Sequence, residues 1–173
     1  MARKPGNSKP EQGSGSSAFL LAQVGAHAAS RFAERLAELD LTPPQAGLLR
    51  AIAVEPGRSQ QALAKQLGTP PPRLVALVDG LERRGVVQRR RNPDDRRLHA
   101  IHLTEAGGKL LSQLGRIAIT HGQDITTALD DTERRQLHRL LARIAEQQEL
   151  VAGVHPGYRT LGEASARARK PTC

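Results

Sequence analysis

The chain has 173 residues, a net charge of +9 and a pI near 10.9, which favours a polyanionic partner, with nucleic acid ahead of a membrane surface. This length suits one domain with a buried core, or one domain with tails. Cys173 is the only cysteine, so we expect neither an internal disulfide nor a cysteine-based metal site, and a reducing, cytoplasmic compartment fits. Aromatic residues are too scarce for base stacking on single strands. No apolar run approaches the roughly 18 residues of a membrane span.

The N-terminal part combines a polar tail with one long predicted helix. Residues 1–17 lack apolar content, which predicts a disordered basic tail. Apolar residues then recur every three or four positions from Leu21 to Leu39, which predicts a helix over residues 17–39. A basic start, an apolar run and the small-residue triplet at 26–28 faintly imitate a secretory signal. Cleavage there would bisect the helical stripe, which argues against a signal peptide.

Two shorter helices are predicted next. One opens at Thr42, a hydroxyl N-cap followed by proline at the first helical position. It ends at residues 55–57, Glu-Pro-Gly, a turn that is also a candidate for a short strand. The next helix starts at Ser59 and stops at Gly68, where glycine suits a helix C-terminus.

A fourth helix begins within residues 69–72, Thr-Pro-Pro-Pro, because proline is tolerated in a first helical turn. It stops at Gly85. Its predicted core stripe consists of Leu74, Leu77, Val78 and Leu81. A tight turn joins it to the preceding helix and one of its faces stays free, which indicates a helix–turn–helix.

Residues 86–103 are predicted to form an arginine-rich hairpin. Two alternating segments flank the Asn-Pro-Asp-Asp tip at 92–95, which also suits an ordinary tight turn. Between Arg58 and Leu103, ten Arg or Lys residues stand against four Asp or Glu, a net charge of +6. This concentration argues for a binding surface, whereas a merely arginine-rich composition would spread the charge evenly.

The C-terminal part carries two more predicted helices. Thr104 caps a long one whose apolar content extends to Ala128 and Leu129, and Asp130 with Glu133 resembles a capping box that opens the next. The fold class is therefore mainly α with a small β-wing. We expect a tail at 1–17, a helical dimerisation region at 18–40 and 104–150, a winged helix–turn–helix DNA-binding domain at 41–103, and a basic flexible tail at 151–173. The apolar faces of the outer helices predict a dimer built from both chain ends.

Three segments carry a family resemblance: LTPPQA at 41–46, LVALVDGLERRG at 74–85 and NPDDRRLHAIHLTEAG at 92–107. Over residues 18–150 the chain strongly resembles the MarR family of winged-helix transcriptional regulators. The resemblance implies a two-fold symmetric homodimer that binds double-stranded DNA at a pseudo-palindromic operator. It also implies a repressor that a small phenolic or other aromatic acid releases by binding between the dimerisation and DNA-binding lobes.

The chain departs from the family pattern in two places. The fourth helix begins Pro-Pro-Pro-Arg at 70–73, where relatives usually carry hydroxyl residues, so fewer hydrogen-bond donors are available for base readout at its tip. The redox-sensing branch of the family uses a cysteine in its first helix, and this chain has none there. We therefore do not expect peroxide sensing by that route.

Candidate base contacts lie on the fourth helix, since a helix fits the major groove of B-form DNA. Arg73 is the candidate for a bidentate contact with guanine, because its planar fork matches O6 and N7. Val75 and Ala76 are candidates for contacts with thymine methyl groups.

Phosphate contacts are expected at helix starts and at the hairpin. Ser59, Gln60 and Thr69 lie where free N–H groups and hydroxyls suit phosphate oxygens, and Arg83 and Arg84 either meet the DNA backbone or stay solvated.

The family's wing pattern of aspartate, any residue, arginine falls on Asp95 and Arg97. Arg96 or Arg97 is expected to enter the minor groove, while Asp95 pairs with an arginine to hold the tip in shape. The complete set of candidate DNA-contacting residues is Ser59, Gln60, Thr69, Pro72, Arg73, Val75, Ala76, Arg83, Arg84, Asp95, Arg96 and Arg97.

Other function classes find little support in the sequence. His99 and His102 lie three residues apart on a predicted strand and so face opposite sides, and we predict no metal site, cofactor or catalytic residue. His27 is a weak candidate for effector binding, and an ordinary interface histidine is the plainer interpretation. The alternative function is a winged-helix module that binds protein, or DNA without sequence preference.

Overall fold

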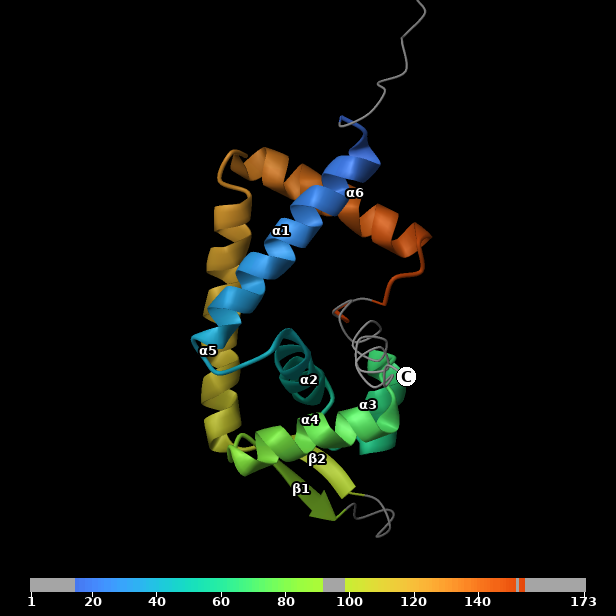
Figure 1. Cartoon of the computed structure of the whole chain (residues 1–173), viewed down its shortest axis with the longest axis vertical. Coiled ribbons are helices and arrows are strands. Elements are labelled where there is room, and N and C mark those ends of the chain that lie inside the picture. Colours follow the sequence, from blue (N-terminus) through green and yellow to red (C-terminus); the bar gives the residue numbers. More distant parts are fainter. Residues whose placement is uncertain (1–14, 92–98, 152, 155–173) are drawn as a thin grey trace, which may run out of the picture.

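The computed structural model describes residues 15–91, 99–151, 153 and 154. Within these residues the chain forms a mainly helical structure with one two-stranded sheet (Figure 1). The elements are α1 (Ser17–Ala37), α2 (Pro43–Val54), α3 (Gln60–Leu67), α4 (Pro71–Arg83), β1 (Val87–Arg91), β2 (His99–Leu103), α5 (Glu105–Ile125) and α6 (Asp131–Gln147). We refer to α2, α3, α4 and the sheet together as the winged-helix lobe.

Capping bonds confirm the predicted starts of α2, α3, α5 and α6. The Thr42 hydroxyl accepts from the Gln45 N–H while the Gln45 side chain accepts from the Thr42 N–H, a complete capping box. Asp130 and Glu133 form the same arrangement at the start of α6. At the end of α3, Gly68 adopts the left-handed conformation, with φ of 58°, that lets the chain turn sharply into α4.

The end of α5 differs from the sequence expectation. The predicted helix included Ala128 and Leu129, whereas α5 ends at Ile125. The hydroxyls of Thr126 and Thr127 donate to backbone carbonyls one turn earlier, at 2.7 Å and 3.2 Å. Such bonds compete with continued helix formation. The capping box that follows then starts α6 in a new direction (Figure 1).

The hairpin forms as predicted. β1 and β2 pair antiparallel in a register that runs from Val87 opposite Leu103 to Arg91 opposite His99. The segment at 55–57, a candidate for a short strand, forms a turn instead. Just after it, Ser59 makes one isolated bridge with Ala100 of β2. The Asn-Pro-Asp-Asp tip lies outside the described residues.

One hydrophobic core joins the winged-helix lobe to both flanking regions. Its fully buried side chains are Leu36, Leu48, Leu49, Ile52, Leu63, Leu67, Leu74, Val78, Leu81, Val87 and Ile101. Leu36 belongs to the last turns of α1, and Leu110 and Leu114 of α5 join the same core. One end of α1 and the first half of α5 are therefore packed into the winged-helix lobe.

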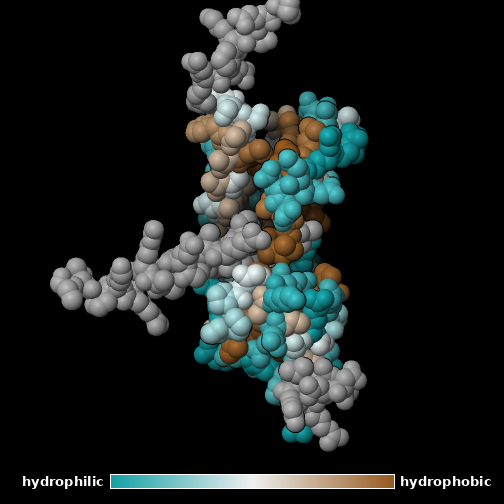
Figure 2. Space-filling model, turned by 90° about the vertical axis from the view of Figure 1, so that its right-hand side faces the viewer, coloured by the Kyte–Doolittle hydropathy of each residue, from teal (hydrophilic) through white to brown (hydrophobic). Residues whose placement is uncertain are grey.

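The far ends of these helices leave apolar surface exposed. In α1, Phe19, Leu20, Leu21 and Val24 are exposed, and in α6 so are Leu140, Leu141 and Ile144. We call these seven residues the outer apolar faces. Hydrophobic surface gathers in the upper part of the molecule in Figure 2, where α1 and α6 lie in Figure 1. Clusters of this kind mark interaction sites. No described helix is both long and apolar enough to cross a membrane.

A histidine lies where α1 packs against α5. The rings of Phe32 and His121 are 5.2 Å apart between centroids, and Arg35 on α1 forms an ion pair with Asp124 on α5. Burial, and secondly the charge of Arg35, lower the pKa of His121 below its ordinary value. The helix contact therefore favours the uncharged form of this side chain.

At Gly107, the start of α5 lies close against the backbone of Val86. A Cβ added there would overlap the carbonyl oxygen of Val86, which already accepts a 3.1 Å bond from the Thr104 N–H. Beside Gly108 there is no heavy atom within 4 Å of an added Cβ. Substitution of Gly107 therefore tests the close packing, whereas substitution of Gly108 tests helix propensity alone.

We expect Gly107→Ala to lower the free energy of unfolding by about 2–3 kcal/mol, because the new methyl group displaces a bonded backbone carbonyl. Gly108→Ala should raise it by about 0.5–1 kcal/mol, since alanine is the better helix former. Urea unfolding at one fixed protein concentration measures both. Equal effects of the two substitutions would contradict the close approach.

Candidate nucleic-acid interface

The outer face of α4 is apolar over its first two turns. We define this face by its exposed residues Pro71, Pro72, Val75, Ala76 and Arg83. It follows from the helical period, because Leu74, Val78 and Leu81 turn into the core. Pro70, the N-cap, makes no side-chain capping bond. The helix therefore presents a smooth, largely aliphatic surface with a single cation near its C-terminal end.

Arg73, the predicted guanine contact, does not lie on this outer face. Its side chain is half-buried and its Nε atom is shielded from solvent. The Nε atom is therefore not available for a contact with guanine in this position. The assignment stays a prediction.

The predicted phosphate contacts at α3 differ in exposure: Ser59 and Gln60 are half-buried, whereas Thr69 is buried. The Ser59 hydroxyl caps α3 by accepting from the Ala62 N–H at 3.2 Å. The Gln60 Nε2 atom is shielded from solvent.

Thr69 is only 5% exposed and its hydroxyl is buried, so the structure does not present it to a phosphate. The reason lies in the turn after α3, where the Thr69 N–H donates to the Ala64 carbonyl at 3.0 Å and closes the turn.

Two exposed polar residues of α3 were not predicted. Gln61 and Lys65 line a surface hollow of about 630 Å³ together with Ser59, Pro70 and Pro71, at the junction of α3 and α4. Their i, i+4 spacing opposite the buried Leu63 and Leu67 was the signal in the sequence.

Several arginines of the basic segment have structural partners. Arg89 of β1 forms ion pairs with Asp79 and Glu82 of α4, which anchors the hairpin to the helix. Arg58 pairs with Glu55. By contrast, the exposed Arg90 and Arg91 form no ion pair with another described residue. Fewer cations are therefore available for binding than the ten Arg and Lys residues between Arg58 and Leu103.

Arg84 was predicted either to meet the DNA backbone or to stay solvated, and the structure shows that it also has partners within the protein. Its guanidinium donates to the carbonyl oxygens of Leu39 at 2.9 Å and of Asp40 at 2.5 Å, just after α1. Asp40 holds a left-handed backbone conformation, with φ of 51°. Arg84 thus ties the C-terminal end of α4 to the turn between α1 and α2, whereas the neighbouring Arg83 is exposed.

The remaining predicted site residues are placed as follows. The wing residues Asp95, Arg96 and Arg97 lie outside the described residues. His27 is exposed on α1 and does not line the pocket between the helices. No group of three or more His, Cys, Asp or Glu side chains in the described part of the chain is arranged to hold a metal ion.

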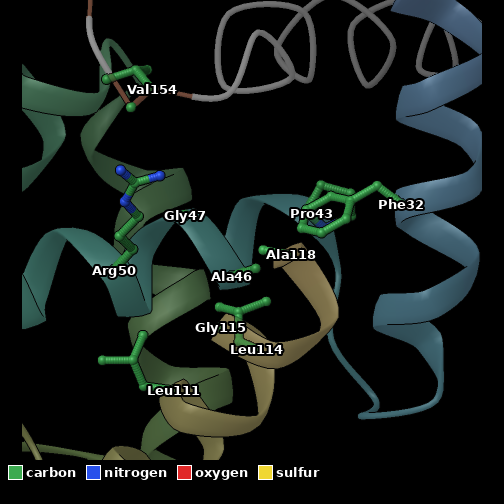
Figure 3. Close-up of a pocket in the computed structure, with 11 residues that line it drawn as sticks. Phe32, Pro43, Ala46, Gly47, Arg50, Leu111, Leu114, Gly115, Ala118 and Val154 are labelled. Atoms are coloured by element: carbon green, nitrogen blue, oxygen red, sulfur yellow. The ribbon is translucent and has the colours of Figure 1, made fainter. Parts of the chain in front are cut away.

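A pocket of about 570 Å³ lies between α1, α2 and α5 (Figure 3). Its walls are mainly apolar: Phe32 comes from α1, Pro43 and Ala46 from α2, and Leu111 and Leu114 from α5. Arg50 of α2 is the one charged residue among the described residues of its lining, and Gly153 and Val154 also border it. This volume and composition are typical of pockets for small molecules.

Arg83 and Arg84 offer a test with adjacent residues. We expect Arg84→Ala to lower the free energy of unfolding by about 1 kcal/mol, because two charge-assisted bonds of an exposed group are lost. Arg83→Ala should leave unfolding within about 0.5 kcal/mol and reduce the slope of log affinity for DNA against log salt by about 0.9 for each protomer bound. Urea unfolding and salt-dependent fluorescence anisotropy measure these effects. The opposite pattern would reverse the two assignments.

Comparisons with known proteins agree with this geometry. The model of the MarR family matches residues 39–98. A transcriptional regulatory protein for the hcr operon of Thauera aromatica is 36% identical over 107 residues, which cover 62% of this chain and 64% of that protein. The chain thus spans slightly less than two thirds of that relative. Transcriptional regulator HosA of Escherichia coli O111:H- is 30% identical over 105 residues, which cover 61% of this chain and 78% of HosA.

Solved structures show the same fold. The transcriptional repressor CouR bound to a 23-mer DNA duplex is 33% identical, with a TM-score of 0.68 over 81% of this chain and 99% of CouR. A mutant of MarR from E. coli complexed with operator DNA is 26% identical, with a TM-score of 0.63 over 73% of this chain and 91% of that one. The chain belongs to the MarR family of winged-helix transcriptional regulators.

Proposed function

We propose that the chain is a homodimeric repressor that acts in the cytoplasm by binding double-stranded DNA sequence-specifically. The observation that carries this proposal is the free outer face of α4, exposed beside cations of the same lobe. A helix with an unobstructed face enters the major groove, where each base pair presents a distinct pattern. Lys65, Arg83, Arg90 and Arg91 are exposed around it and suit phosphate contacts. The DNA-bound relatives CouR and MarR support this mode.

The proposed dimer buries the outer apolar faces of α1 and α6. These faces are exposed in one chain, and α6 contributes no buried residue to the core that the structure describes. A two-fold axis through this region would place two α4 helices on one side of the dimer. The operator would then be pseudo-palindromic, with half-sites whose spacing follows the protein symmetry.

The alternative, a module without sequence preference, is distinguished by salt and sequence. Phosphate contacts alone give an affinity that falls steeply between about 50 and 200 mM salt, whereas base readout preserves a preference. We expect the purified protein to bind the duplex upstream of its own gene more tightly than a shuffled duplex at both ends of this range. Fluorescence anisotropy measures the ratio of the two affinities.

Equal affinity for both duplexes, disappearing together as salt rises, would favour the non-specific module. Sequence-specific repression would then require an operator elsewhere in the genome. Selection of duplexes from a random library tests whether such a sequence exists. Enrichment of no sequence in that selection would end the proposal of specific repression.

We infer that the pocket of Figure 3 receives the effector, a small aromatic acid. Apolar walls from three helices suit an aromatic ring, and Arg50 suits a carboxylate, since a guanidinium binds carboxylates bidentately. The pocket joins α1 and α5 to α2, which lies in the winged-helix lobe. A ligand there would therefore couple the position of the dimerisation helices to that of the lobe.

Arg50 provides the test of this inference. We expect 4-hydroxybenzoate to bind and to release DNA, with 4-hydroxybenzamide as the uncharged control, because loss of a charge-assisted pair costs about 1.5–3 kcal/mol. Arg50→Gln should abolish the preference for the acid over the amide and leave DNA affinity without ligand unchanged. Isothermal titration calorimetry measures the first effect, and anisotropy measures the second. An unchanged preference in Arg50→Gln would remove Arg50 from the effector site.

A further inference from the structure

The first two turns of α4 combine exposure with an unusual lack of polar groups. On the outer face, Pro71, Pro72, Val75 and Ala76 are all exposed, and Val75 is 40% exposed. None of these side chains donates or accepts a hydrogen bond. In the helix that the proposed function assigns to the major groove, the part nearest the N-terminus is therefore aliphatic.

The polar side chains closest to this face are either ion-paired within the lobe or partly shielded from solvent. Asp79, one turn beyond Val75, forms an ion pair with Arg89 of β1. Arg73 is half-buried with its Nε shielded from solvent, and the hydroxyl of Thr69 is buried. These three side chains are therefore less available to base edges than the exposed apolar residues are.

An aliphatic surface has only one favourable partner in the major groove of unmodified DNA. Each base edge there presents hydrogen-bond donors or acceptors, and thymine adds its 5-methyl group. Contact with the polar edges of a G·C pair would remove water from donors and acceptors without replacing their bonds, which is unfavourable. A smooth apolar tip therefore selects for thymine and against G·C pairs.

We propose that α4 reads its operator through thymine 5-methyl groups, which Val75 and Ala76 contact with Pro72 beside them. This inference rests on the proposed function and specifies the DNA that the same face binds. The exposed cations on the same lobe, Lys65, Arg83, Arg90 and Arg91, match phosphates, which favours DNA over an apolar protein segment as the occupant. Specificity then comes from methyl positions within each half-site.

Deoxyuridine tests the inference, because it replaces thymine by removing only the 5-methyl group. The native upstream duplex is compared with one that carries deoxyuridine at every thymine of the central half-sites. A matched control carries the same number of deoxyuridines in the flanks. We expect the affinity to fall about fourfold for each methyl group contacted, the factor that corresponds to burial of one methylene-sized group. The flank control should bind like the native duplex.

The protein side of the test uses a substitution that keeps the side-chain shape. Val75→Thr replaces one methyl group by a hydroxyl and should weaken binding to the thymine duplex by a few-fold, with little further loss on the deoxyuridine duplex. Ala76→Ser should show the same non-additive behaviour. Arg83→Ala serves as the control and should weaken both duplexes by the same factor, because phosphates are present in each.

Two outcomes overturn the inference. If the half-site deoxyuridine duplex binds as tightly as the native one while the shuffled duplex still binds weakly, the repressor stands and methyl readout is wrong. If Val75→Thr weakens the thymine and deoxyuridine duplexes equally, the apolar face does not act through the methyl groups. Equal binding of native and shuffled duplexes would instead reject the proposed function, and the inference with it.

Discussion

Burial of Leu36 holds the two parts of this molecule together. This side chain belongs to α1, a helix whose other end carries exposed apolar residues, yet it is fully buried in the core of the winged-helix lobe. Two further contacts tie the flanking helices to the same lobe: the bonds of Arg84 to the turn after α1, and the close approach of Gly107 to Val86. The lobe is therefore not an independent module joined by linkers. A change in the angle of α1 or α5 is a change in the packing around α4.

The basic charge of the chain serves two purposes that composition alone does not separate. Arg84 and Arg89 hold α4 in place, one against the turn after α1 and one through ion pairs that fix the hairpin. Lys65, Arg83, Arg90 and Arg91 remain exposed on the same lobe. Arg84 and Arg89 fix the position of α4, whereas the exposed cations suit long-range attraction of a polyanion. This division suggests why so many arginines lie in so short a segment.

The helix starts could be predicted because capping is local: Thr42, Ser59, Thr104 and Asp130 each satisfy N–H groups within three residues. The hairpin could be predicted from the two alternating segments that flank its tip. Residue partners across long sequence distances could not be predicted in the same way. Nothing local in the sequence shows that Arg84 bonds to carbonyls about 45 residues earlier, or that Thr69 turns inward. The pocket was equally hidden, because its apolar lining looks like ordinary core in the sequence.

The length of α1 gives its fixed end a mechanical consequence. A helix of 21 residues is about 30 Å long, at about 1.5 Å per residue. Since Leu36 is held near its C-terminal end, any tilt of the helix about this residue would move mainly the opposite end. A tilt of about 5° about Leu36 would move the opposite end by about 2–3 Å over that length. The pocket beside Phe32 lies close to Leu36. A small displacement of α1 at the pocket would therefore be larger at the outer apolar faces, and a displacement of these faces would be smaller where α1 meets the winged-helix lobe.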